Sequence, residues 1–93
     1  MLVGVCRIEL FVPDSGSLKS KRFVLHSIKT RIRNKFNVSV SEIESNDKWQ
    51  RITLGISMVS NERKFIDRTI NEILKIVDGD GRIEIINHFL EVI

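Results

Sequence analysis

The strongest constraint on the fold of this 93-residue chain is the order in which two hydrophobic periodicities follow one another. Residues 2–12, 38–44, 49–59 and 82–92 contain stretches in which apolar residues alternate with other residues, a spacing that is typical of strands. Between the first two of these segments, and again between the last two, apolar residues recur at helical spacing. The sequence therefore predicts the order β-α-β-β-α-β.

This order predicts a single α+β domain over residues 1–93 with the split βαβ, or ferredoxin-like, architecture. That fold has a four-stranded antiparallel sheet with both helices on one face, and right-handed crossovers leave few other compact topologies. The short connection "SNDK" (residues 45–48) predicts that the second and third strands form a hairpin. The inward face of the last strand stays unassigned, because two alternations within it favour opposite faces.

Serine residues are the predicted N-caps of both helices, since a serine hydroxyl can accept a hydrogen bond from a free amide of the first helical turn. Ser17 precedes the first helix and Ser60 precedes the second. The first helix is expected to pack through an apolar stripe of Leu18, Leu25, Ile28, Ile32 and Phe36.

The first helical segment also concentrates positive charge. Residues 17–36 contain no Asp or Glu, whereas the rest of the chain has eight basic and 12 acidic residues. The seven basic residues of the segment are Lys19, Lys21, Arg22, Lys29, Arg31, Arg33 and Lys35. Such an asymmetry indicates an anionic partner on one side of the molecule.

Much of this charge is predicted to lie on one side of the helix. At 100° per residue, five positions fall within about a quarter of the circumference, beside the apolar stripe. Like charges one turn apart destabilise a helix, so an unrelieved row favours a surface that tracks a phosphate backbone. The alternative is a solvated helix face. The five residues are Lys19, Arg22, His26, Lys29 and Arg33.

The loop before this helix has two interpretations. Its hydroxyls, amides and cations could hold a phosphate or sulfate, or the loop could be a plain capped helix start. Lys21 falls close to the apolar stripe, where its stem could be buried. The loop lacks the pattern GxxxxGK[ST], so no nucleotide is specified. The residues of this anion contact zone are Ser15, Gly16, Ser17, Lys19, Lys21 and Arg22.

The open face of the predicted sheet is apolar rather than aromatic. The chain has no tyrosine and no match to the aromatic motifs with which sheet-face RNA-binding domains stack bases. Val3, Val5 and Val59 are expected on this face, and apolar patches of a few hundred Å² often mark an interface. A homodimer through the sheet is the resulting hypothesis.

Catalytic, metal and membrane chemistry find little support in the sequence. Cys6 is in register with core positions, and neither His26 nor His88 has a neighbouring partner for a triad or a metal site. "DGDG" (residues 78–81) lacks the later ligands of a calcium loop and is predicted to be a turn. The sequence predicts no enzyme, cofactor or metal. The lone cysteine and the lack of a signal peptide or membrane span favour a cytoplasmic location.

Three stretches carry a resemblance to a known family: "SLKSKR", "RIRNKFNVSVSE" and "DKWQRITLGISMVSN". They resemble the YlxP-like family of small uncharacterised bacterial proteins, along nearly the whole chain. The resemblance implies a ferredoxin-like fold and no established activity. It also implies a gene setting often shared with transcription and translation factors, including a ribosome-assembly factor. The last strand departs most from the family.

The functional prediction is a non-enzymatic RNA- or ribosome-associated module. The alternative is a self-associating protein-interaction domain whose basic helix is only solvated. The sequence names neither the RNA nor the protein partner. The predicted anion-binding residues are Ser17, Lys19, Lys21, Arg22, Lys29 and Arg33, and the predicted interface residues are Val3, Val5 and Val59.

Overall fold

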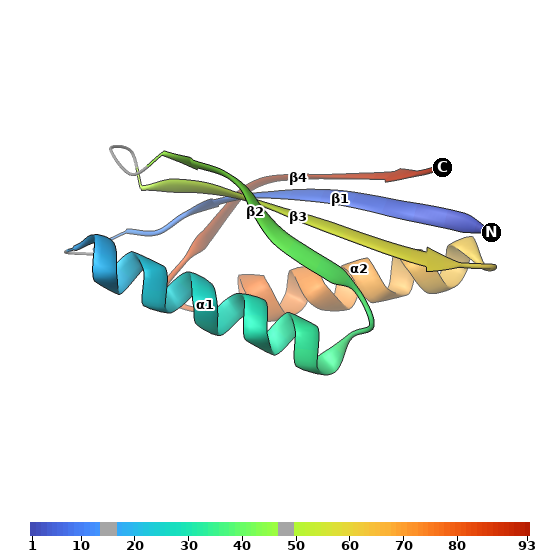
Figure 1. The fold of residues 1–93 in the computed structure, drawn as a ribbon, viewed down its shortest axis with the longest axis horizontal. Coiled ribbons are helices and arrows are strands. Elements are labelled where there is room, and N and C mark those ends of the chain that lie inside the picture. Colours follow the sequence, from blue (N-terminus) through green and yellow to red (C-terminus); the bar gives the residue numbers. More distant parts are fainter. Residues whose placement is uncertain (14–16, 47–49) are drawn as a thin grey trace.

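A computed structural model describes residues 1–13, 17–46 and 50–93 of the chain. It confirms the predicted order of elements (Figure 1). Each predicted strand and helix is present, with ends close to those expected. The elements are β1 (Leu2–Phe11), α1 (Leu18–Lys35), β2 (Ser39–Asn46), β3 (Arg51–Ser60), α2 (Arg63–Asp78) and β4 (Glu84–Val92).

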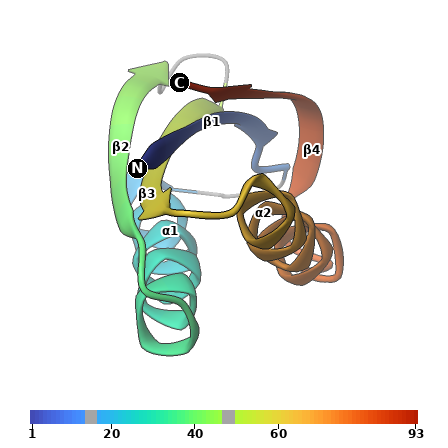
Figure 2. The same ribbon diagram turned by 90° about the vertical axis from the view of Figure 1, so that its right-hand side faces the viewer.

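The four strands form one sheet in the order β2-β3-β1-β4, with every neighbouring pair antiparallel. Both helices pack against the same face of this sheet, as Figure 2 shows. The ferredoxin-like architecture and the β2–β3 hairpin are therefore confirmed. No helix or strand of the described residues covers the opposite face, which we call the outer face. The two strands at the edges are β2 and β4.

Alternating burial along the central strands builds the core. Cys6, Ile8 and Leu10 of β1 are fully buried, while the residues between them face outward. The core residues of β3 follow the same spacing from Ile52 to Met58, and the helices supply the other half of the core. Sheet residues two apart share a face, so this pattern places one layer of side chains against the helices.

Strand β1 and helix α2 approach each other closely at Gly4. A Cβ atom at this position would lie 2.6 Å from Cγ2 of Ile66 and 3.4 Å from Cγ of Met58. A real Cβ does not come this close to a branched methyl group, so the backbone can sit here only without a side chain. Gly4 therefore sets the spacing between the sheet and α2.

The two halves of β4 turn different sets of residues toward the core. Ile85 lies opposite Leu10, whereas Asn87 lies opposite Glu9, so Ile86 is an extra residue on β4. Beyond this bulge the inward positions change from odd to even residue numbers, because each residue added to a strand reverses the face of those that follow. The two conflicting alternations seen in the sequence are both real, one on each side of Ile86.

The helix ends agree in part with the predicted caps. The hydroxyl of Ser17 accepts a hydrogen bond from the backbone N–H of Ser20 at 3.1 Å, which confirms the first N-cap. The Ser60 prediction is wrong, because Ser60 ends β3 and its hydroxyl accepts the N–H of Glu62 before α2 begins. Leu18, expected in the apolar stripe, is 54% exposed.

Candidate nucleic-acid interface

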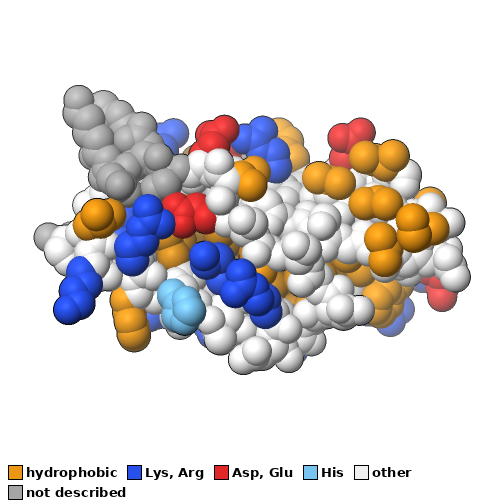
Figure 3. Space-filling model, viewed as in Figure 1, with side chains coloured by type: hydrophobic (Ala, Val, Ile, Leu, Met, Phe, Trp, Pro, Cys, Tyr) orange, Lys and Arg blue, Asp and Glu red, His pale blue; other side chains and the backbone are white. Residues whose placement is uncertain are grey.

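The basic flank of α1 lies beside the edge strand β2. Two contacts place it there: Arg22 reaches Glu42, and Nη2 of Arg33 donates a hydrogen bond to the carbonyl oxygen of Val40 at 3.2 Å. Figure 3 shows Lys and Arg side chains gathered over α1 on this side of the molecule. The helix therefore presents this flank along the β2 edge of the sheet.

Arg22 has its charge matched by an acidic residue from outside the helix. Its Nη1 donates to both carboxylate oxygens of Glu42, at 2.9 and 2.6 Å. Glu42 lies on the inward side of β2, opposite Leu54, so its carboxylate is directed toward α1. The predicted absence of an acid near Arg22 holds along the sequence but not in the fold. We therefore assign Arg22 to fixing α1 against β2.

Lys21 belongs to the core side of α1 and not to its charged flank. It is 2% exposed, and it shares the buried stripe with Leu25, Ile28 and Ile32. The long methylene stem of a lysine can fill such a position. Because a ligand at the surface cannot reach so buried an ammonium group, Lys21 is left out of the binding surface.

The start of α1 is capped by its own sequence. Ser17 accepts from Ser20, so its hydroxyl already satisfies one of the free amides that an anion would bind. The predicted loop residues Ser15 and Gly16 lie outside the described residues. Within the described chain, this cap favours a plain capped start over an anion contact zone at this end of the helix.

Three cations remain on the flank: Lys19, Lys29 and Arg33, which we call the basic row. Lys19 and Arg33 are exposed and Lys29 is half-buried. Within residues 1–13, 17–46 and 50–93, none of the three forms an ion pair. Lys19 and Arg33 lie 14 positions apart, or about 21 Å along the helix. His26, also exposed, lies on the same flank.

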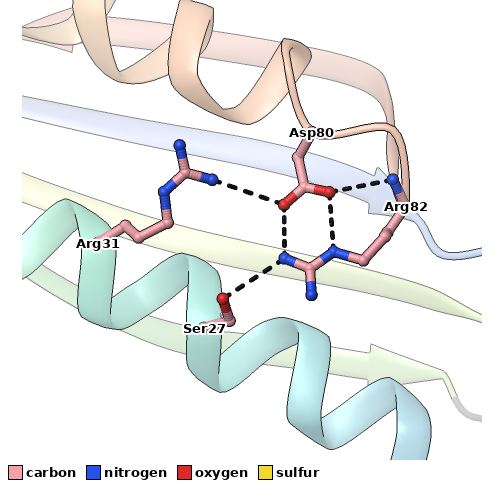
Figure 4. Close-up of polar contacts among 4 residues, drawn as sticks. All are labelled: Ser27, Arg31, Asp80 and Arg82. Atoms are coloured by element: carbon pink, nitrogen blue, oxygen red, sulfur yellow. Dashed lines mark hydrogen bonds and ion pairs between the residues drawn. The ribbon is translucent and has the colours of Figure 1, made fainter.

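The opposite flank of α1 is fastened to the turn before β4. Asp80 accepts two side-chain hydrogen bonds from Arg82, at 2.7 and 3.0 Å, and one from the backbone N–H of Arg82 (Figure 4). Arg31 of α1 lies 3.7 Å from the same carboxylate, and Arg82 also donates to the hydroxyl of Ser27. This cluster links α1 to the C-terminal part of the chain.

The electrostatics of Asp80 follow from these contacts. Its side-chain hydrogen bonds with Arg82 are the largest cause that lowers its pKa from 3.8 to about 2, and the nearby charges of Arg82 and Arg31 act in the same direction. Burial opposes the shift but is outweighed. The carboxylate is therefore ionised at neutral pH and relieves the charge of Arg31. Sequence reasoning interpreted "DGDG" only as a turn, and no local pattern identified its partner on α1.

The outer face brings the predicted valines together. Val3 of β1 lies directly opposite Val59 of β3, and Val5 lies two residues further along β1. On the other side of β1, Val3 exchanges two backbone hydrogen bonds with Ile93, at 3.0 and 2.8 Å. Val59, Val3 and Ile93 thus form an apolar row across three chain segments. Figure 3 shows hydrophobic side chains gathered at this end of the sheet.

No arrangement typical of catalysis is seen in the described residues. Cys6 is fully buried, and burial raises the pKa of its thiol from 9.0 to about 11, so the reactive thiolate is disfavoured. His26 and His88 are exposed on different elements. Among residues 1–13, 17–46 and 50–93, no group of three or more His, Cys, Asp or Glu side chains could hold a metal ion. Neither α1 nor α2 is long and apolar enough to cross a membrane.

Comparison with known proteins supports the resemblance seen in the sequence. The model of a family described as "Protein of unknown function (DUF503)" matches residues 3–89. "Uncharacterized protein YlxP" of Bacillus subtilis (strain 168) is 43% identical over 83 residues, which cover 89% of this chain and 90% of that protein. The predicted YlxP-like family is confirmed.

Two solved structures are among those that superpose on the chain. The structure of Rv0793 from Mycobacterium tuberculosis superposes with a TM-score of 0.52 at 18% identity, covering 97% of this chain and 92% of that chain. A designed protein described as LFR1 1 "with ferredoxin fold" has a TM-score of 0.48 at 11% identity, covering 100% of this chain and 84% of that one. At such low identity the likeness to Rv0793 shows the fold alone.

Proposed function

The chain belongs to the DUF503 family of proteins of unknown function, and we propose that it is a binding module, not an enzyme, that associates with RNA or with the ribosome through the basic row of α1. The observation that carries this proposal is the position of Lys19, Lys29 and Arg33 on one flank of a rigid helix. Among the described residues, no acidic side chain pairs with any of them. Cations held in this way can contact successive phosphates of a nucleic-acid strand.

The fold explains why this flank, and no other part of α1, is the proposed surface. Asp80 matches Arg31 on the opposite flank, and Glu42, which lies on the same flank as the basic row, has its charge matched by Arg22. Arg33 is held by Val40, yet a guanidinium has five N–H donors and keeps several for a phosphate. Contacts of this kind position a strand without reading its bases, so the binding is expected to be independent of sequence.

The row predicts a definite salt dependence. With about three phosphate contacts, log K on single-stranded RNA should fall with log[salt] at a slope near −2, since each contact releases roughly 0.7 counterion. Replacing Lys29 and Arg33 together with alanine should weaken binding by roughly 25-fold at 0.1 M salt and flatten the slope by about 1.4. Fluorescence anisotropy at several salt concentrations measures both quantities.

Helix α2 offers a matched control for this double variant. Lys64→Ala with Arg68→Ala removes the same charge from exposed positions on the other helix, and should leave most of the affinity and the slope in place. Equal losses of affinity in the two double variants would show that binding depends only on the net charge of the protein. Unchanged affinity in a folded Lys29→Ala, Arg33→Ala protein would refute an RNA-binding role for α1.

Self-association through the outer face is the second candidate, and a separate observation favours it. Val59, Val3 and Ile93 align across the sheet, and β1 adds Val5, 38% exposed, one row further on. In an antiparallel sheet with helices on one side, the open side is usually polar. An apolar end of this kind fits a second copy of the chain, because a twofold contact pairs the same patch with itself.

One substitution separates the two candidates. Val5→Glu should convert a dimer into a monomer in sedimentation, because it places a second carboxylate beside Glu91 and next to the apolar row, where burial against another copy would cost free energy. Phe65→Glu, on the exposed side of α2, makes the same kind of change away from the outer face and should leave the oligomeric state unchanged. A wild-type protein that is monomeric at high concentration would end this hypothesis.

A further inference from the structure

Where β2 begins, the edge of the sheet is uneven because β3 extends further than β2. The first residue of β2, Ser39, lies opposite Ser57 of β3, whereas β3 continues to Ser60. The last three residues of β3 therefore extend past β2. The end of α1 and the segment that follows it border the uncovered space, which is an open hollow of about 630 Å³. We call this hollow the notch.

The residues that line the notch supply three kinds of surface: a cation, neutral polar groups and an apolar wall. Arg33 supplies a cation at one side, and Asn37, Ser39 and Ser57 supply neutral hydrogen-bonding groups. Val3 and Val59 supply an apolar wall. Within the described chain, no Asp or Glu lines this space. The notch therefore suits a ligand with an anionic group, polar edges and a flat apolar body.

The position of the notch connects it to the basic row. Arg33 is the last cation of the row and also lines the notch, and its hydrogen bond to Val40 fixes it at the boundary between them. A strand whose phosphates follow α1 from Lys19 to Arg33 would reach the notch with its next nucleotide. This continuity favours a nucleotide over other anionic ligands with an apolar part.

We propose, on the basis of the RNA-binding function proposed above, that the notch seats one unpaired nucleotide of the bound strand. The phosphate lies at Arg33, the base edge meets the Asn37 amide and the Ser39 hydroxyl, and the face of the base or ribose packs on Val3 and Val59. Duplex RNA keeps its bases stacked and paired, so only a single strand can place a base there. The module is thereby selective for single-stranded RNA, although it reads little sequence.

The test compares three probes with the full chain at one salt concentration: a short single-stranded RNA, an abasic strand of equal length and a duplex of equal length. The normal single strand should bind about fivefold more tightly than the abasic strand, which is roughly the net contribution of one hydrogen bond to the base edge. The salt slopes of the two single strands should agree, because the base contact involves no charge. The duplex should bind no better than the abasic strand.

A variant of the notch provides the second arm. Asn37→Ala with Ser39→Ala changes two exposed residues and should remove the fivefold advantage of the normal strand while leaving abasic binding and both slopes unchanged. Equal binding of all three probes would overturn the notch but leave the basic row in place. Absence of binding to every probe would overturn the RNA proposal itself. Displacement of the strand by hexaglutamate as readily as by uridine monophosphate would also overturn the notch, in favour of an acidic peptide.

Discussion

Replacing Asp80 with asparagine should lower the free energy of unfolding by about 2 kcal/mol at pH 7 and by almost nothing near pH 2. The folded-state pKa of Asp80 is about 2, below its ordinary value of 3.8. Each pKa unit corresponds to about 1.4 kcal/mol of differential stabilisation of the charged form. An asparagine keeps the size of the side chain but removes the charge that holds Arg82 and Arg31.

The sign of the pH dependence follows from the lowered pKa. The ionised form contributes its full stability above the unfolded-state pKa of about 4, and this contribution is lost as the pH falls toward the folded-state pKa. Urea unfolding of the wild type and of Asp80→Asn should therefore give a difference that is constant from pH 7 to about pH 5. The difference then shrinks toward zero near pH 2. A difference that stays constant to low pH would show that the Asp80 contacts are not electrostatic.

Replacing Gly4 with alanine is expected to destabilise the protein by about 2 kcal/mol. The new Cβ would lie 2.6 Å from the Ile66 Cγ2 methyl, which branches directly from Cβ of Ile66 and cannot swing away. Overpacking of this kind displaces β1 or α2 and costs about 1–3 kcal/mol. Thermal or urea unfolding measures the loss.

Two comparisons isolate the clash from a general effect of adding a methyl group. Gly81→Ala makes the same substitution where no described atom lies within 4 Å, so the stability should change by less than about 0.5 kcal/mol. Ile66→Leu keeps the volume but moves the branch away from Cβ, so Gly4→Ala should cost less in that background. Equal costs for Gly4→Ala in the wild-type protein and in the Ile66→Leu variant would contradict the proposed close contact.

The fold was accessible from the sequence because its signals are local. The alternation in β1 and the helical spacing of Leu25, Ile28 and Ile32 each depend on residues a few positions apart, and these patterns predicted the elements. The face of β4 was not accessible. One added residue, Ile86, reverses the alternation, and nothing in the local pattern marks which side of it is paired with which part of β1.

The candidate site was predictable only as a set of charges. Helical spacing placed Lys19, Lys29 and Arg33 on one flank, and their positions are as expected. The partners of the other cations come from elsewhere in the chain: Glu42 is 20 residues from Arg22, and Arg82 is 55 residues from Ser27. Only the packing of the helices on the sheet decides which cations are matched by acidic residues, so the sequence could not separate the matched cations from the others.

The notch and the self-association surface share residues, so a nucleotide and a second copy of the chain cannot both occupy them completely. Val3 and Val59 belong to each, so a second copy of the chain and an unpaired nucleotide would compete for the same wall. If both occupants exist, RNA should shift the protein toward the monomer. The opposite shift, toward dimers on adding RNA, would require the two surfaces to be separate.

The alternation along β1 has a consequence for how this strand can change during evolution. Its even-numbered residues from Gly4 to Leu10 are enclosed by the helices, whereas its odd-numbered residues from Val3 to Phe11 lie on the open side of the sheet. Substitutions at even positions are therefore constrained by the stability of the fold. Substitutions at odd positions are constrained by the molecules that bind the open side of the sheet in the cell. Even-numbered and odd-numbered residues of this one strand are therefore under different selective pressures. Divergence among relatives at the odd positions would reflect changes of partner rather than changes of fold.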